Sequence, residues 1–385
     1  MNDLGLVMSG GAARGAYEAG VLRFLYTDLP RRLGFVPWPS VVSGTSVGAL
    51  NGVFPASHDT QQIGRLSRLW QEMCIGEVFE VRPGSLFKII RGSFKGDQQM
   101  GLLDPSPLYK TLARLNPMDH VHRNIDQGKL RALVISATQL KTGYNMLFVD
   151  AGKGGLDFVA LPGSRIQPTR VQVPHLLASA GLPFLFPPVK VEGDWYVDGG
   201  LRQNTPLRPL LRAGVHRVLV IGCQASREQE GAKPLANVTP TLTFLLGKTL
   251  NALMLDPVER DLWGAERINE ILAWGERTYG PDFTAGVKRD LNVQNVGVLH
   301  LRPSEDLGRI ANHTLRTTTP ECSNQARWLL NLLSDSANDS DGESDTLSYL
   351  YFDHHYTAAL EQLGWEDTAR REEEVANFLL QDHAA

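Results

Sequence analysis

The chain has 385 residues, 42% hydrophobic and 21% charged, which is enough to bury a large core in one large domain or two medium ones. Its formal net charge of −4 argues against general binding to nucleic-acid phosphates. Its three cysteines lack the paired spacing of a disulfide framework or of a zinc site (Cys74, Cys223 and Cys322).

The same features favour a cytoplasmic setting. Sparse, unpaired cysteines suit a reducing compartment. Met1-Asn2-Asp3 runs directly into a short apolar strand, without the basic start and long apolar run of an ordinary signal peptide. No stretch reaches the roughly 20 apolar residues of a membrane helix. We therefore expect a cytoplasmic protein whose contact with a membrane, where it occurs, is peripheral. Export by a route that leaves no such signal is the open alternative.

The first elements in chain order predict the opening of a parallel α/β sheet. Leu4–Met8 is apolar throughout, as in a buried strand, and the glycine-rich turn Ser9–Gly15 follows it. Ala16–Leu29 then has the apolar periodicity of a helix. A second strand, Val41–Ser43, leads into a second helix that begins at Val47. Strand, loop and helix repeated in this order are typical of parallel sheets.

Further elements follow at wider spacing. The strand candidates are Ala132–Ala137, Met146–Asp150, Trp195–Asp198, Val218–Cys223 and Val296–Leu301. The helix candidates are Pro206–Ala213, Thr239–Trp274 with a break or kink at Pro257, Thr346–Leu363 and Thr368–His383.

Composition suggests four consecutive regions. Residues 1–226 would form the main core, and residues 227–333 would complete the same domain with helices and a strand. Residues 334–345, rich in Ser, Asp and Gly, read as an acidic linker before a C-terminal helical segment, 346–385. Residues 83–103 mix apolar and basic side chains, which suits either a cap or lipid-contacting patch or plain core packing.

The most informative motif is Gly44-Thr45-Ser46-Val47-Gly48, which fits the G-x-S-x-G pattern of a nucleophilic serine. The preceding strand and following helix provide the expected context. Gly44 and Gly48 leave room for a sharp turn that exposes the Ser46 hydroxyl. Taken alone, the pentapeptide also fits an ordinary loop between a strand and a helix.

The glycine-rich turn Ser9–Gly15 offers a site for an oxyanion. Small residues expose backbone N–H groups there, and the N-terminus of the following helix adds its positive end. A dinucleotide-binding fingerprint is a competing interpretation, but Ala12 stands where the middle glycine belongs. A merely structural turn is the other alternative.

The proton acceptor is harder to find. A serine hydrolase usually pairs its serine with a histidine, but none of the ten occupies a distinctive position (His58, His120, His122, His175, His216, His300, His313, His354, His355 and His383). Asp198 is a better candidate, because it ends a strand and precedes Gly199-Gly200. Taken alone, Asp-Gly-Gly is also a common turn.

Together these motifs resemble the patatin-like phospholipase family. The resemblance spans about Leu4 to Leu207 and includes Ala178-Ser179-Ala180-Gly181-Leu182-Pro183, followed by Phe184 and Phe186. It implies a three-layer sandwich in which helices flank a mainly parallel sheet. It also implies a Ser46–Asp198 dyad without histidine, and a dyad that calls for no metal or cofactor. The oxyanion hole would use amides at Gly10, Gly11 and Ala12, with Arg14 shaping the loop. Supporting roles fall to Gly15, Gly44, Gly48, Gly199 and Gly200.

Many family members have a third glycine where this chain has Ala12, and alanine serves well only if its φ need not be positive. The expected activity is hydrolysis of carboxylic esters of phospholipids or lysophospholipids through an acyl-enzyme. Two alternatives remain open: a general esterase or acyltransferase with the same dyad, and a non-catalytic lipid-sensing protein. The sequence does not indicate the oligomeric state.

Overall fold

The computed structural model describes residues 4–81, 101–115, 117–152, 156, 162–225, 258–291, 293–334 and 345–380. The predicted cap at 83–103 therefore lies almost wholly outside the described residues. So do most of the predicted linker and residues 239–257 of the long predicted helix. Within the described ranges, none of the helices combines the length and hydrophobicity that crossing a bilayer requires.

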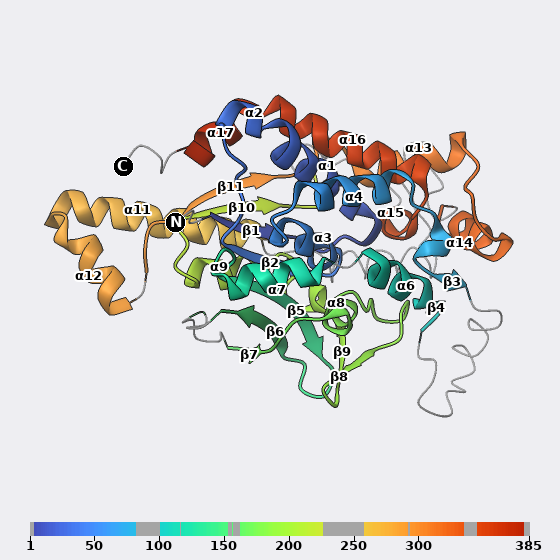
Figure 1. Cartoon of the computed structure of the whole chain (residues 1–385), viewed down its shortest axis with the longest axis horizontal. Helices are drawn as coiled ribbons and strands as arrows, with labels where there is room; N and C mark the ends of the chain where they lie inside the picture. The colour runs from blue at the N-terminus through green and yellow to red at the C-terminus, as the bar shows by residue number, and fades with distance from the viewer. Residues whose placement is uncertain are drawn as a thin grey trace, which may run out of the picture.

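A nine-stranded, mostly parallel sheet forms the centre of the molecule (Figure 1). Its main path runs β11-β10-β1-β2-β5-β6-β7, and β9 pairs with both β5 and β8. The first five strands of this path are parallel, whereas β6 and β9 run antiparallel to β5. The strands are β1 (Leu4–Met8), β2 (Val41–Thr45), β5 (Ala132–Gln139), β6 (Asn145–Ala151), β7 (Ser164–Pro168), β8 (Val189–Val191), β9 (Asp194–Asp198), β10 (Arg217–Ile221) and β11 (Gly297–Leu301), with a separate pair β3 (Glu80–Val81) and β4 (Leu103–Asp104).

Helices cover both faces of this sheet. They are α1 (Gly15–Arg23), α2 (Pro30–Leu33), α3 (Val47–Ala56), α4 (Thr60–Gln71), α6 (Ser106–Leu115), α7 (Met118–Asp126), α8 (Val173–Ser179), α9 (Leu207–Arg212), α11 (Val258–Tyr279), α12 (Asp282–Leu291), α13 (Leu307–Thr317), α14 (Asn324–Ser334), α15 (Asp345–Leu350), α16 (His354–Arg370) and α17 (Glu372–Leu380).

Strand alternation explains the three layers. Successive side chains of β1 point to opposite faces, so Leu6 and Met8 join the large core beneath α1, α3 and α16, while Val7 joins a second core. In that second core Val7 packs with Leu207 and Leu210 of α9, and Leu262 of α11 lies against it. Strands buried on both faces read as continuous apolar runs, which is why the central strands were predictable.

The C-terminal helices pack against the N-terminal ones. In Figure 1 the red helix α16 runs beside the blue helix α1, and two glycines allow this approach. A Cβ at Gly20 would overlap the carbonyl of Glu361, and one at Gly364 would overlap that of Tyr17. The Arg23 guanidinium donates to Glu361 Oε1 at 2.7 Å, and Glu361 is buried. Residues 345–380 thus belong to the main body.

Most predicted elements are present, with altered ends. The predicted helix Ala16–Leu29 is α1 continued by one π-helical turn, Phe24–Asp28. The described part of the predicted helix 239–274 begins at Val258 and continues to Tyr279. Two C-terminal helices were predicted, and the structure has three, α15, α16 and α17. The chain leaves helical conformation after Leu350, and Asp353 is the N-cap of the next helix, α16.

Candidate active site

Ser46 lies at a sharp turn between β2 and α3. Its φ of 54° and ψ of −126° are strained values for a residue other than glycine. A Cβ at Gly44 would overlap the carbonyl of Gly48, and one at Gly48 would overlap that of Met8. The two glycines of the motif therefore permit a tight turn after β2 that runs close to the end of β1 and leaves Ser46 at the carboxyl edge of the sheet.

Strand register brings Asp198 to the same place. Thr45 pairs with Ser136 of β5, and the next residue of β5, Ala137, pairs with Asp198 of β9. Ser46 and Asp198 therefore meet across the end of β5. Asp198 Oδ1 accepts a hydrogen bond from the Gly200 amide at 2.7 Å, whereas the buried Oδ2 has no partner that meets hydrogen-bond criteria among the described residues.

Burial raises the pKa of Asp198 to about 7, and the Ser46 hydroxyl and the Gly200 amide oppose this rise. Asp198 is fully buried. The Ser46 hydroxyl is thus near enough to affect the carboxyl electrostatically without an ideal hydrogen bond to Oδ2. Such contacts are often long in unliganded sites and tighten when substrate binds. The pair has the chemistry of a nucleophile and its base.

Ser179, at the end of α8, fixes the turn from behind. Its hydroxyl accepts from the Ser46 amide at 2.9 Å and donates to the Ser136 carbonyl at 2.6 Å. This role for Ser179 was not predicted. Its position in a run of small residues, Ala178-Ser179-Ala180, was the available signal, because a hydroxyl among alanines often bonds to nearby backbone.

The glycine-rich loop lies next to Ser46, since β1 and β2 are parallel neighbours and Met8 pairs with Gly44. The amide of Gly10 donates to the carbonyl of Asn204 at 3.0 Å. It is therefore engaged in this structure, which leaves the amides of Gly11 and Ala12 as the oxyanion-hole candidates. Ala12 has a φ of 49°, the positive value that alanine tolerates poorly.

A buried carboxyl lies behind this loop. Glu18 of α1 is fully buried, and burial raises its pKa to about 8, while the Asn51 side chain opposes the rise. Asn51 Nδ2 donates to Glu18 Oε2 and to the Gly15 carbonyl, each at 2.9 Å, and Asn51 Oδ1 accepts from Trp70 at 3.0 Å. These bonds join α1, α3 and α4. The signal in the sequence was an acid surrounded by apolar residues within one helix.

Ser46 opens onto an apolar cavity of about 70 Å³. Ala12 and Phe54 line it near the serine, with Leu182 and Phe186 from the segment before β8, and α4 and α6 provide further walls. Phe352 closes it from the C-terminal part of the chain. Pockets for drug-sized ligands usually measure about 300–1,000 Å³. In this state the cavity is therefore much smaller than a pocket for a drug-sized ligand.

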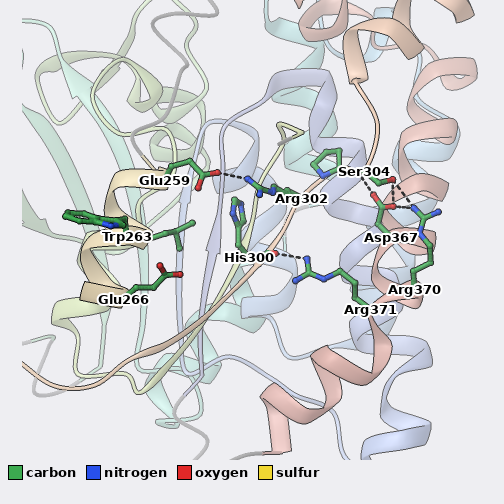
Figure 2. Close-up of a pocket in the computed structure, with 11 residues that line it drawn as sticks. Glu259, Trp263, Glu266, His300, Arg302, Ser304, Asp367, Arg370 and Arg371 are labelled. Atoms are coloured by element: carbon green, nitrogen blue, oxygen red, sulfur yellow. Dashed lines mark hydrogen bonds and ion pairs between the residues drawn. The ribbon is translucent and has the colours of Figure 1, made fainter. Parts of the chain in front are cut away.

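A larger cavity of about 750 Å³ lies at the carboxyl end of β11, away from Ser46 (Figure 2). Its charged groups are largely paired: Arg302 with Glu259, and Arg371 with the His300 carbonyl. Burial, reinforced by Arg302 and Arg371, lowers the pKa of His300 to about 4. None of the described residues around the Ser46 cavity is a histidine.

Comparison with known proteins identifies a family for the chain. The family profile of patatin-like phospholipases matches residues 6–211. A search of curated protein sequences found no significant match. Among solved structures, VipD from Legionella pneumophila aligns with 97% of this chain and 67% of its own, at 13% identity and a TM-score of 0.34.

Human GIVD cytosolic phospholipase A2, in complex with methyl gamma-linolenyl fluorophosphonate, aligns with 98% of this chain and 58% of its own. Its identity is 12% and its TM-score 0.42. These two likenesses are weak, and the profile match, which covers more than half of the chain, supports the assignment without them. The chain belongs to the patatin-like phospholipase family.

Proposed function

We propose that the protein is a lipid acyl hydrolase that cleaves carboxylic esters of phospholipids or lysophospholipids with Ser46 and Asp198. The observation that carries the proposal is a fully buried carboxyl beside a serine on a strained turn, at the mouth of an apolar cavity. The Asp198 pKa, raised to about 7, makes this carboxylate a better base than an exposed aspartate.

In the proposed first half-reaction, the Ser46 Oγ attacks the ester carbonyl carbon while Asp198 takes the hydroxyl proton. The amides of Gly11 and Ala12 stabilise the oxyanion, and each good donor of this kind is worth about 3–4 kcal/mol. The bond to the leaving alcohol then breaks, and Asp198 returns the proton to that oxygen. An acyl-enzyme at Ser46 remains.

Water completes the cycle. Asp198 removes a proton from the water as it attacks the acyl carbon, the bond to Ser46 Oγ breaks, and the proton returns to the serine. The fatty acid leaves, and the site is regenerated. Each step uses groups that lie together at the carboxyl ends of β1, β2 and β9.

The test combines covalent labelling with ester hydrolysis. We expect a fluorophosphonate probe to label the wild-type protein and Ser43→Ala but not Ser46→Ala. Ser43 is a buried serine of the same strand and is the matched control. Asp198→Asn should lower kcat by about 10²–10⁴-fold, the usual contribution of a general base. Asp194→Asn, at the start of the same strand, is its control.

Labelling that persists in Ser46→Ala, or near-full activity in Asp198→Asn, would overturn the assignment. A wild-type protein that binds phospholipid vesicles but neither reacts with the probe nor hydrolyses esters would instead be a lipid-binding protein. Comparing a phospholipid, a lysophospholipid and a simple ester as substrates then separates the lipid hydrolase from a general esterase.

A further inference from the structure

The C-terminal segment holds a residue of the oxyanion loop. Arg14, in the short 3₁₀ turn Ala12–Arg14 (η1), is 5% exposed, and its Nε donates to the Ser348 hydroxyl at 2.8 Å. Its guanidinium carbon lies 4.1 Å from the centre of the Tyr349 ring, within the range of a cation–π interaction. Ser348 and Tyr349 belong to α15, more than 330 residues farther along the chain.

This contact acts on the loop directly. The Arg14 amide donates to the Gly11 carbonyl at 3.0 Å, so moving Arg14 moves the residues that carry the candidate oxyanion amides. Ala12 is held between them at a positive φ that it would leave if the loop were released. A strained conformation persists only where its surroundings enforce it.

The segment itself is firmly placed. α15 packs on η1, and the Ser348 hydroxyl also interacts with Tyr356, whose own hydroxyl donates to the Leu307 carbonyl at 3.1 Å. Tyr351 stacks on Tyr356, with ring centres 5.4 Å apart. The clamp on Arg14 is therefore built into the same body as the sheet. It lies outside residues 6–211, which match the family profile.

We propose that Ser348 and Tyr349 are positioning residues for the oxyanion loop, acting through Arg14, so that α15 is a functional part of the active site. The expected effect on kcat rests on the proposed function, whereas the expected effect on the conformation of the loop does not. A misplaced loop weakens oxyanion stabilisation in the transition state more than substrate binding, so it lowers kcat and leaves KM nearly unchanged.

The experiment measures kcat and KM with a soluble short-chain ester. Tyr349→Leu, which removes the ring, should lower kcat about tenfold or more with KM within about twofold, because small displacements at an active site have large kinetic effects. Tyr349→Phe keeps the ring and should restore most of the rate. Ser348→Ala should give a smaller loss. The matched control is Tyr26→Leu, a buried tyrosine outside α15 whose ring stacks on Trp38.

A second measurement does not require activity. Hydrogen–deuterium exchange of the amides of residues 9–15 should be faster in Tyr349→Leu than in wild type, and unchanged in Tyr26→Leu. If Tyr349→Leu fails to fold, Ser348→Ala, which removes a single hydrogen bond, provides the same comparison.

Equal kcat losses in Tyr349→Leu and Tyr26→Leu, or unchanged exchange in the loop, would overturn the inference and leave the proposed function intact. The opposite result is also distinguishable: the wild-type protein is inactive and unlabelled, but Tyr349→Leu still speeds exchange in the loop. It would remove the proposed hydrolase activity and keep the clamp.

Discussion

Replacing Glu18 by Gln should change how the stability of the protein depends on pH. Glu18 has a pKa of about 8 in the folded protein, raised from 4.5 by burial. Between these values the unfolded chain has released the proton and the folded protein has kept it, so the folded state binds more protons and its stability falls as pH rises. The loss accumulates at about 1.4 kcal/mol per pH unit and stops above pH 8.

Glutamine has no proton to release, so the Glu18→Gln variant lacks this slope. We expect its free energy of unfolding, relative to wild type, to increase by about 3 kcal/mol between about pH 5 and pH 7.5. The amide also changes local hydrogen bonding, but that offset does not depend on pH and cancels when the two pH values are compared. The difference between conditions therefore isolates the ionisation of Glu18.

Urea unfolding, followed by tryptophan fluorescence at the two pH values, measures this difference in unfolding free energy. Glu276→Gln, the same substitution at an exposed position, is the control. Parallel stability curves for wild type and Glu18→Gln would refute the reasoning, because they would show a Glu18 pKa that is equal in both states. A difference that shrinks as pH rises would show that the folded protein prefers the ionised carboxylate.

Three further predictions concern the site. Asp198 must be ionised to accept a proton, and its pKa is about 7. We therefore expect kcat/KM for a neutral ester to rise with pH and to reach half of its plateau value near pH 7. A midpoint near pH 4 would contradict the role of a buried base. Phe352→Leu enlarges the cavity, so a longer acyl chain can bury more of its length there. The kcat/KM for the dodecanoyl ester of p-nitrophenol, divided by that for the butanoyl ester, should rise about fourfold for each extra methylene buried. An unchanged ratio would show that the acyl chain binds elsewhere. Ala12→Gly relieves a positive φ and should raise the free energy of unfolding by about 0.5–1 kcal/mol, whereas a loss of that size would show that Ala12 is unstrained in solution.

The sequence was informative where local chemistry decides structure. β1 and β10 are nearly continuous apolar runs, which is typical of strands in a parallel sheet buried on both faces. Gly44 and Gly48 predicted a sharp turn, because a turn of this kind leaves no room for side chains at those two positions. Asp198 was singled out because it ends a strand and precedes two glycines, and it lies beside Ser46 although its strand, β9, runs antiparallel to β5.

Relations between distant segments were not predictable in the same way. Nothing near Ser348 indicates that its hydroxyl will meet Arg14, since that contact depends on how α16 crosses α1. β7 was missed because Ser164–Pro168 is polar and only partly buried, without the alternation that identifies a strand. The engaged Gly10 amide was missed for a similar reason, because its partner, Asn204, lies on a separate loop.

The place of β1 and α1 in the fold has a consequence for biosynthesis. β1 is made before the other strands of this sheet, but it lies between β10 and β2, and the packing of α1 is completed only when α16 has been made. About 320 residues separate Ser46 from the end of α16, which is roughly 15–65 s of translation at common rates. If the clamp on Arg14 acts as proposed, a nascent chain carries its nucleophile throughout that time with an unfinished oxyanion loop. Ester cleavage would then reach its full rate only once α15 and α16 are in place.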